Sequence, residues 1–323
     1  MLLVTGGLGY IGSHFVIAAL QSGYDVLVVD NLSNSHADTQ NHIETIAQCH
    51  FQFIEGDIRD KALLKKLFAE HQIDVVVHFA GLKAVAESVV SPMRYYDNNV
   101  YGSLVLLEVM QEYHVQKMIF SSSATVYGEP QYLPYDEQHP TNPINPYGHT
   151  KLHVENILQD ICQADKKFAA VTLRYFNPIG AHPSGLIGEN PKDIPNNLMP
   201  YIIKVAQGDL PYLQVFGNDY DTRDGTGERD YIYIMDLVQG HLAALSYLDK
   251  KGFHIFNLGT GTGTTVLELV TAFESANSMT ISKRLMPRRE GDLSKFWANP
   301  SLAKRELNWQ AVTPLHVGCQ LNS

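Results

Sequence analysis

The sequence VTGGLGYIG occupies residues 4–12 of this 323-residue chain and contains a G-x-G-x-x-G pattern that begins at Gly7. A short apolar stretch over residues 2–5 precedes it, and apolar residues at helical spacing follow it over residues 11–19. Glycines between a strand and a helix permit a tight turn and let a pyrophosphate approach the backbone at the helix N-terminus. The segment therefore predicts a strand, a phosphate-binding turn and a helix, with a glycine-rich turn that binds nothing as the alternative.

The first half of the chain continues this alternation of strands and helices. Its apolar and β-branched runs do not alternate strictly with polar residues, which is typical of strands buried on both faces. We expect strands at residues 2–5, 25–30, 50–55, 74–79, 117–121 and 168–174, with helices around residues 60–71, 98–113 and 147–163. This order predicts an α/β fold with a doubly wound parallel sheet, the Rossmann arrangement.

The second half differs in composition, because Pro and Gly become dense at residues 177–200 and 217–227. Such segments are typical of irregular loops that close over a ligand. We therefore divide the chain into a dinucleotide-binding domain over residues 1–176 and a smaller α/β substrate-binding domain over residues 177–323. Apolar runs within residues 230–258 either rejoin the first sheet or build a small second one.

Composition narrows the possible partners. The formal net charge is −10, whereas general nucleic-acid binding requires an excess of basic residues. No apolar run is long enough for a membrane span. Cys49, Cys162 and Cys319 are too far apart for a disulfide framework or a zinc site, which favours a reducing, cytoplasmic location. His149 and His153 have an i, i+4 spacing, but no catalytic glutamate lies between them, so we expect no metal.

The second expected strand ends in Asp30, eighteen residues after Gly12. A carboxylate at this position accepts hydrogen bonds from the adenosine ribose hydroxyls and repels a 2′-phosphate. No arginine lies near it in the sequence. These features favour NAD over NADP, and a simple helix-capping role for Asp30 is the alternative.

Tyr147 and Lys151 lie four residues apart, which places them on the same face of the helix expected over residues 147–163. A free phenol has a pKa near 10, and lowering it to about 7 takes about 4 kcal/mol. One cation about 4 Å away at an effective dielectric constant of about 20 supplies about that much. With help from a positive nicotinamide ring, Lys151 is therefore expected to make Tyr147 a general base. A solvated Tyr–Lys pair on the surface is the alternative.

Three serines stand at the end of the fifth expected strand, where ligands bind in doubly wound sheets. Ser123 is the one that we expect to hydrogen-bond a reacting oxygen and to pass a proton towards Tyr147. For Ser121 and Ser122, hydroxyls that only satisfy loop backbone are the simpler interpretation.

A set of motifs along the chain extends these individual signals. They read TGGLGYIGSH, DNLSNS, EGDIRD, HFAGLKAVAESV, YYDNNV, FSSSATVYGEP, NPYGHTK, LRYFNPIGAHPSG, IPNNLMPYI, FGNDYDTRDGTGERDYI and PRREGDLSKFWA. Together they resemble the UDP-glucose 4-epimerases, a family of extended short-chain dehydrogenases/reductases, from residue 1 to about residue 310. The glycine turn and Y-x-x-x-K mark only the superfamily, whereas GLKAVAESV, PNNLMPY and REGD are specific to the family.

The resemblance implies NAD as the cofactor and assigns residues to three sets. The implied catalytic residues are Tyr147, Lys151 and Ser123. The implied cofactor-binding residues are Gly6, Gly9, Tyr10, Ile11, Gly12, Asp30, Asn31, Asp57, Ile58, Phe79, Ala80, Lys83, Asn98, Tyr147, Lys151 and Phe176. The implied substrate-binding residues are Ser123, Asn177, Asn197, Leu198, Phe216, Arg229, Tyr231, Arg289, Asp292 and Phe296.

The reaction that the resemblance implies is the interconversion of UDP-galactose and UDP-glucose. Tyr147 takes the proton of the sugar 4-hydroxyl while hydride leaves C4 for NAD, the 4-keto hexose turns over, and hydride returns to its other face. Arg229 and Arg289 are suited to binding diphosphate oxygens, and Asp292 to binding the uridine ribose. A homodimer formed through the helices around residues 98–113 and 147–163 is also implied.

Three other functions fit the same fold. The resemblance places Phe296 at the family's size gate beside the sugar, where a UDP-N-acetylhexosamine 4-epimerase needs a small residue. Plain core packing is the alternative role for Phe296. An NDP-sugar 4,6-dehydratase usually has an Asp-Glu pair where this chain has Ala124 and Thr125. A non-catalytic NAD-binding protein is expected to lack the tyrosine or the lysine.

Overall fold

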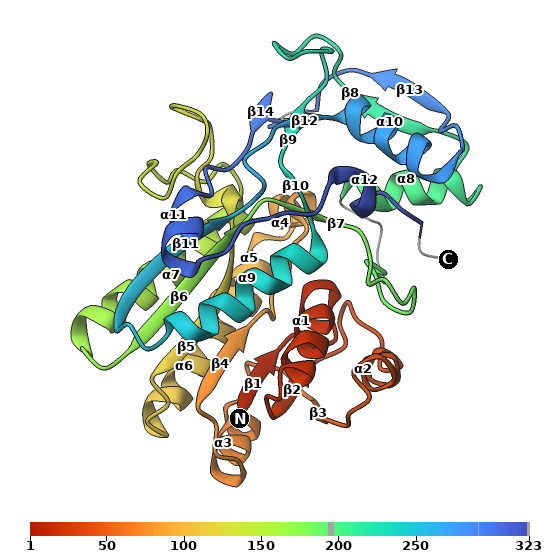
Figure 1. The fold of residues 1–323 in the computed structure, drawn as a ribbon. Coiled ribbons are helices and arrows are strands. Elements are labelled where there is room, and N and C mark those ends of the chain that lie inside the picture. The colour runs from red at the N-terminus through yellow and green to blue at the C-terminus, as the bar shows by residue number, and fades with distance from the viewer. Residues whose placement is uncertain (193–196, 290, 322–323) are drawn as a thin grey trace.

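The computed structural model describes residues 1–192, 197–289 and 291–321, and its centre is a seven-stranded sheet in which every pair of neighbours is parallel (Figure 1). The strand order is β11-β6-β5-β4-β1-β2-β3. The strands are β1 (Leu2–Thr5), β2 (Val26–Asp30), β3 (Gln52–Glu55), β4 (Val75–His78), β5 (Lys117–Ser123), β6 (Ala169–Tyr175) and β11 (Gly252–Leu258). The expected doubly wound parallel sheet is confirmed.

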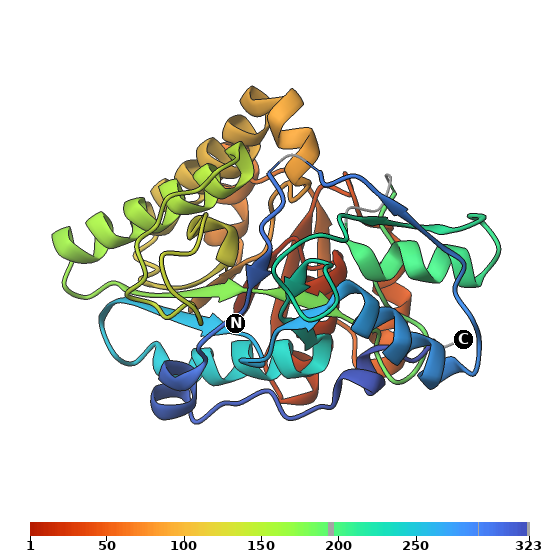
Figure 2. The same ribbon diagram turned by 90° about the horizontal axis from the view of Figure 1, so that it is seen from above.

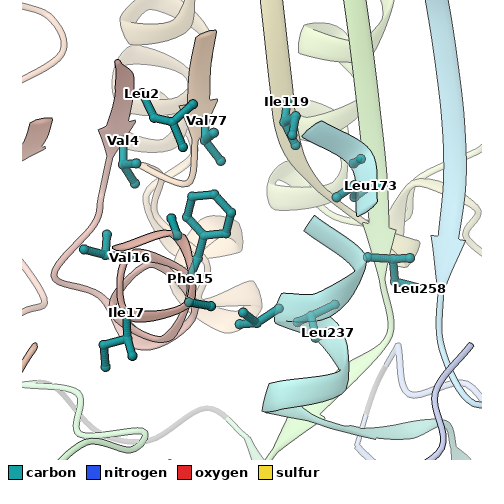
Figure 3. Close-up of a cluster of buried hydrophobic side chains, with 14 of the residues drawn as sticks. Leu2, Val4, Phe15, Val16, Ile17, Val77, Ile119, Leu173, Leu237 and Leu258 are labelled. Carbon is teal, nitrogen blue, oxygen red and sulfur yellow. The ribbon is translucent and has the colours of Figure 1, made fainter. Parts of the chain in front are cut away.

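Helices cover both faces of this sheet (Figure 2). One layer contains α1 (Tyr10–Gln21) and α9 (Ile234–Tyr247), and Figure 3 shows Phe15 and Leu237 from these helices beside strand residues. The other layer contains α3 (Lys61–Glu70), α6 (Gly102–Glu112) and α7 (Pro146–Ala164).

Strand β1 shows why the central strands are mainly apolar. Leu2 and Val4 pack in the cluster with α1, whereas Leu3 between them packs in the cluster with α3 and α6. Because successive side chains of a strand point to opposite faces, a strand covered by helices on both sides needs apolar residues at every position. All four residues of β1 are buried.

Helix formation departs from the expectation around residues 98–113. A π-helical turn, η1 (Tyr96–Tyr101), precedes α6. The Asn99 side chain in this turn accepts a hydrogen bond from Leu82 N (2.8 Å) and donates one to Leu82 O (3.0 Å). Helices α4 (Val85–Val90) and α5 (Pro92–Tyr95) come just before it in the chain, and a 3-10 turn, η2 (Ala124–Val126), follows β5. A further helix, α2 (Thr39–Ala47), packs against α1.

The second half of the chain forms small sheets and helices around a separate apolar cluster. Its strands are β7 (Asn177–Ile179), β8 (Leu213–Phe216), β9 (Glu228–Arg229), β10 (Tyr231–Tyr233), β12 (Thr264–Thr265), β13 (Lys283–Met286) and β14 (Lys295–Phe296). Its helices are α8 (Leu198–Ala206), α10 (Val266–Asn277), α11 (Ser301–Leu307) and α12 (Leu315–Gly318). The run over residues 230–258 follows both expected routes, because β11 rejoins the large sheet while β10 pairs with β7.

Within the described residues, no helix is long and apolar enough to cross a membrane.

Candidate active site

The glycine turn between β1 and α1 has the geometry that a phosphate cradle requires. Gly6 has a φ of +70°, and a Cβ on Gly12 would lie 2.2 Å from Gly6 O. Helix α1 begins after Gly9, and no side chain caps its first turn. Backbone N–H groups of that turn are therefore available to an anion, and only glycines allow the backbone to fold this closely.

A pocket at the carboxyl edge of the large sheet contains most of the predicted cofactor residues, and we call it the cofactor pocket. Fourteen of those sixteen residues line it: Gly6, Gly9, Tyr10, Ile11, Gly12, Asp30, Asn31, Ile58, Phe79, Ala80, Lys83, Asn98, Tyr147 and Lys151. Asp57 and Phe176 do not. Because these residues follow five different strands, parallel pairing is what brings them together.

Asp30 is held rigidly at the wall of the cofactor pocket. Its carboxylate accepts hydrogen bonds from Leu8 N (3.0 Å), Leu32 N (2.9 Å) and the Ser35 hydroxyl (2.7 Å). The residue is 8% exposed. A fixed negative charge at this position accepts hydroxyl donors and disfavours a second phosphate, so the geometry fits NAD.

Asp57 and Phe176 contact other side chains of the protein and do not line the pocket. Asp57 accepts hydrogen bonds from Asn31 Nδ2 (2.9 Å) and Arg59 Nη2 (2.7 Å), and the hydrogen bonds from Arg59 hold the pKa of its carboxyl well below the usual range. Phe176 packs with Phe296, at a ring-centroid distance of 5.2 Å. In this structure, both residues therefore act on the pocket indirectly, by holding neighbouring side chains in place.

Tyr147 and Lys151 lie together on α7, as predicted. The ammonium of Lys151 is 5.9 Å from the centroid of the Tyr147 ring and donates a hydrogen bond to Ser121 O (2.7 Å). Burial raises the pKa of Tyr147 to about 12, and a hydrogen bond with Ser123 opposes this shift. In the protein alone, burial therefore disfavours the phenolate, and the lowering of the Tyr147 pKa by Lys151 together with a nicotinamide ring stays a prediction for the protein with bound cofactor.

Burial also perturbs Lys151 itself. It lowers the pKa of the amine to about 8, while the charge of Glu155 opposes the shift. Glu155 lies one turn further along α7 in a buried ion pair with Arg174, 2.6 Å away, and accepts a hydrogen bond from Ser122 (2.5 Å). The sequence analysis missed both Glu155 and the Ser121 carbonyl, although the spacing 147, 151, 155 repeats on one helix face.

Ser123 stands where β5 ends, and its hydroxyl caps η2. It accepts hydrogen bonds from Thr125 N (3.2 Å) and the Thr125 hydroxyl (2.9 Å). The Thr125 contacts leave the Ser123 proton free to be donated, and Tyr147 is its partner. Ser123 does not line the cofactor pocket, whereas Ser121 does.

A second pocket lies among the small sheets and α8, and we call it the nucleotide-sugar pocket. Eight of the ten predicted substrate residues line it: Asn177, Asn197, Leu198, Phe216, Arg229, Tyr231, Arg289 and Asp292. Arg289 Nε donates to Asp292 Oδ2 (2.9 Å), and the Arg289 guanidinium stacks 4.8 Å from the centroid of the Phe216 ring. Two arginines in one pocket suit a diphosphate.

The other two predicted substrate residues are Ser123 and Phe296. Phe296 is 8% exposed and packs against Tyr135, with ring centroids 4.9 Å apart. It belongs to a buried aromatic cluster with Phe176, next to Asn177 of the nucleotide-sugar pocket. Part of the IPNNLMPYI motif and Glu290 of the REGD motif lie outside the described residues.

A segment over residues 180–192, which we call the strap, forms a wall of the cofactor pocket. The sequence analysis expected loops over a ligand in this region but named none of the strap residues as cofactor contacts. Six of its residues line the pocket: Leu186, Ile187, Gly188, Glu189, Asn190 and Pro191. The Tyr10 hydroxyl donates to Gly180 O (2.6 Å) at one end, and Lys192 Nζ donates to Leu32 O (2.7 Å) at the other. The density of Pro and Gly in this region was the available signal.

Metal chemistry was not expected here. Over residues 1–192, 197–289 and 291–321, no three His, Cys, Asp or Glu side chains group in a way that would hold a metal ion. His149 and His153 contact each other through His153 Nδ1 and His149 O (2.5 Å).

Comparisons with known proteins agree with this arrangement. A curated UDP-glucose 4-epimerase of Neisseria meningitidis serogroup C is 55% identical over 97% of this chain and 93% of its own length, and one of Bacillus subtilis (strain 168) is 52% identical over 98% and 94%. The crystal structure of UDP-glucose 4-epimerase from Bifidobacterium longum in complex with NAD+ and UDP matches with a TM-score of 0.96 and 51% identity, over 99% of this chain and 97% of that one. The model of the NAD dependent epimerase/dehydratase family matches residues 2–259. The chain therefore belongs to the NAD dependent epimerase/dehydratase family.

Proposed function

We propose that this protein interconverts UDP-galactose and UDP-glucose, with NAD as a cofactor that is regenerated in each cycle. The observation that carries the proposal is the position of Tyr147 and Lys151 on the wall of the cofactor pocket, next to the nucleotide-sugar pocket. Tyr175 lines the first pocket and Asn177 the second, so only one residue separates the two sites along the chain.

The cofactor pocket fits NAD. The cradle around Gly6 and Gly12 leaves no space for side chains, α1 begins without a side-chain cap, and Asp30 presents a fixed carboxylate. When bound there, NAD supplies an acceptor and donor of hydride. The remaining chemistry belongs to side chains of this protein.

Tyr147 is the proposed general base for the sugar 4-hydroxyl. Its phenol has a pKa of about 12 in the protein alone. The Lys151 ammonium, 5.9 Å from the ring centroid, is the proposed source of positive charge that favours its ionisation during the reaction. Ser123 hydrogen-bonds Tyr147 and is suited to pass the proton between the sugar oxygen and the phenol. The carbonyl of Ser121 fixes the position of the Lys151 ammonium.

Anchoring of the substrate through its UDP half explains how one carbon can be inverted. Arg229 and Arg289 are the proposed ligands of the diphosphate, and Asp292 of the uridine ribose, with Phe216 beside them. Because these groups bind the nucleotide and leave the hexose without a rigid clamp, the 4-keto sugar can turn and present its other face. With the hydride that bound NAD would supply to the other face of C4, return of the proton from Tyr147 would complete the epimer.

Specific observations disfavour the alternatives. Ala124 is buried, and Thr125 is engaged with Ser123, so the acid and base that a 4,6-dehydratase needs at these positions are missing. Phe296 fills the space beside Phe176 and Tyr135, which disfavours an N-acetyl group on the sugar.

The test uses protein purified without added cofactor. Denaturation should release NAD in about equal amount to the protein, and the native protein should convert UDP-galactose to UDP-glucose. Assays with UDP-N-acetylglucosamine, and for a 4-keto-6-deoxy product, address the two related activities. A protein that binds no NAD even when it is supplied, and that converts neither epimer, would refute the proposal.

We further propose a homodimer, a reducing cytoplasmic location, and a division into domains over residues 1–176 and 177–323 with β11 and α9 returned to the first. Exposed Tyr101 (53%) and Leu104 (38%) on η1 and α6 support the dimer, and Cys49, Cys162 and Cys319 are free thiols. Light scattering of the wild type and of Leu104→Glu should give a dimer and a monomer, respectively. Equal masses for the two would place the interface elsewhere.

A further inference from the structure

One carboxylate oxygen links the two pockets. Glu189 Oε1 accepts a hydrogen bond from Lys83 Nζ (2.8 Å) and another from Asn197 Nδ2 (2.8 Å). Glu189 and Lys83 line the cofactor pocket, and Asn197 lines the nucleotide-sugar pocket. The Glu189 side chain is 11% exposed, so these contacts form mostly away from water.

A carboxylate in this position is unfavourable for ligand binding by itself. Both proposed ligands carry phosphates, and a negative charge on the wall repels them across a site of reduced dielectric constant. The charge of Lys83 compensates for the carboxylate, but this pairing also removes a cation that would otherwise attract a pyrophosphate. If Glu189 favours ligand binding at all, it must do so by positioning other groups, and its two hydrogen bonds show which groups these are.

The first hydrogen bond fixes the middle of the strap. The strap is attached near its ends through Tyr10 to Gly180 O and through Lys192 to Leu32 O. Glu189 lies between these attachments, and its contact with Lys83 joins the strap to the loop after β4, which also lines the pocket. Closing the strap at this point hinders a dinucleotide from leaving.

The second hydrogen bond fixes an amide. Asn197 is the residue that precedes α8, and no side-chain hydrogen bond caps that helix. An amide nitrogen has two protons, so donation of one to Glu189 leaves the other for a ligand. A charged acceptor restrains the amide more strongly than a neutral one does.

We propose that Glu189 is a positioning residue that serves both ligands, because it holds the strap over the cofactor pocket through Lys83 and orients Asn197 in the nucleotide-sugar pocket. The proposal rests on the proposed function, since it takes the ligands to be NAD and UDP.

The experiment measures the rate of NAD loss and the affinity for UDP, neither of which depends on turnover. Holoprotein is gel-filtered at intervals to follow NAD loss, and UDP binding to the holoprotein is measured by calorimetry. In Glu189→Gln we expect NAD loss to be about tenfold faster and the Kd for UDP to rise about fivefold, because a charge-assisted contact is replaced by a neutral one on each side.

Variants of the two partners separate the two roles. Lys83→Met should accelerate NAD loss and leave UDP binding within twofold of wild type, whereas Asn197→Ala should do the reverse. Adding Glu189→Gln to Lys83→Met should give no further acceleration of NAD loss, because contacting residues are not additive. Glu70→Gln is the matched control, since that exposed carboxylate pairs with Lys66 outside both pockets.

Each outcome decides the question. If Glu189→Gln changes neither quantity while the wild type binds both ligands, the inference is overturned and the proposed function stands. If only NAD loss changes, the role in the nucleotide-sugar pocket is overturned. If the wild type binds neither NAD nor UDP, the proposed function fails and the inference fails with it.

Discussion

Replacing Lys151 with methionine tests the electrostatic part of the proposed mechanism. The ammonium lies 5.9 Å from the centroid of the Tyr147 ring. With the phenolate charge placed at the ring centre and an effective dielectric constant of about 20, a unit charge at that distance stabilises it by about 3 kcal/mol, or about two pKa units. The pKa of Tyr147 is about 12 in the protein alone, so the phenolate is already scarce near neutral pH. Loss of the ammonium should therefore lower turnover at pH 8 about 100-fold.

The same substitution should not destabilise the protein. Burial lowers the pKa of Lys151 to about 8, below its unfolded value of about 10.4, so the folded state binds fewer protons between these two pH values. Stability from this residue therefore rises with pH across that window, and below pH 8 the buried charge costs about 3 kcal/mol. Lys151→Met removes this cost and loses a hydrogen bond to Ser121, worth about 1 kcal/mol. We expect the variant to be about 2 kcal/mol more stable at pH 7.

Turnover of UDP-galactose is measured from pH 6 to pH 10, with urea unfolding at pH 7 and pH 9.5 on the same samples. Lys61→Met is the matched control, because its ammonium pairs with Glu108 at 2.7 Å on an exposed helix face. The control should retain the activity of the wild type at every pH. Turnover of Lys151→Met within threefold of wild type at pH 8, with a parallel pH profile, would refute the electrostatic role.

Three further substitutions test the site. Tyr147→Phe removes the base and one hydrogen bond, so turnover should fall at least ~100-fold while the bound NAD, measured after denaturation, is unchanged; full turnover would exclude Tyr147 as the base. Phe296→Cys opens the aromatic cluster, so UDP-N-acetylglucosamine should become a substrate and unfolding free energy should drop by about 3 kcal/mol; unchanged specificity in kinetic assays would discredit the size gate. Gly12→Ala places a Cβ 2.2 Å from Gly6 O, so the purified protein should contain little NAD, and normal NAD content would show that the turn tolerates a side chain.

The sheet was predictable because burial on both faces leaves a strong local signal. Continuous apolar runs place β1 at Leu2–Thr5 as expected, and Pro146 marks the start of α7. By contrast, α2 has a single buried residue, Ile43, so its sequence carries too little apolar periodicity to indicate a helix. The π-helical turn before α6 depends on the Asn99 contact with Leu82, seventeen residues away, which local patterning cannot reveal.

The part of the site that was predictable consists of residues at the ends of strands. Asp30 and Ser123 end their strands, and parallel pairing then brings them to one edge. The contact of Lys151 with the Ser121 carbonyl was not predictable, since it joins a side chain to the backbone thirty residues earlier. The effect of burial on the Tyr147 phenol was also underestimated, because it depends on tertiary packing around the residue.

The return of the chain to the large sheet also limits how this protein can be divided. Strand β11 pairs along its whole length with β6, and α9 packs on α1. A fragment that stops before residue 230 would expose the edge of β6 and the apolar side of α1 to water and to other strands. Exchange of the specificity half between relatives therefore requires a graft with at least three junctions, so that α9 and β11 remain with their host.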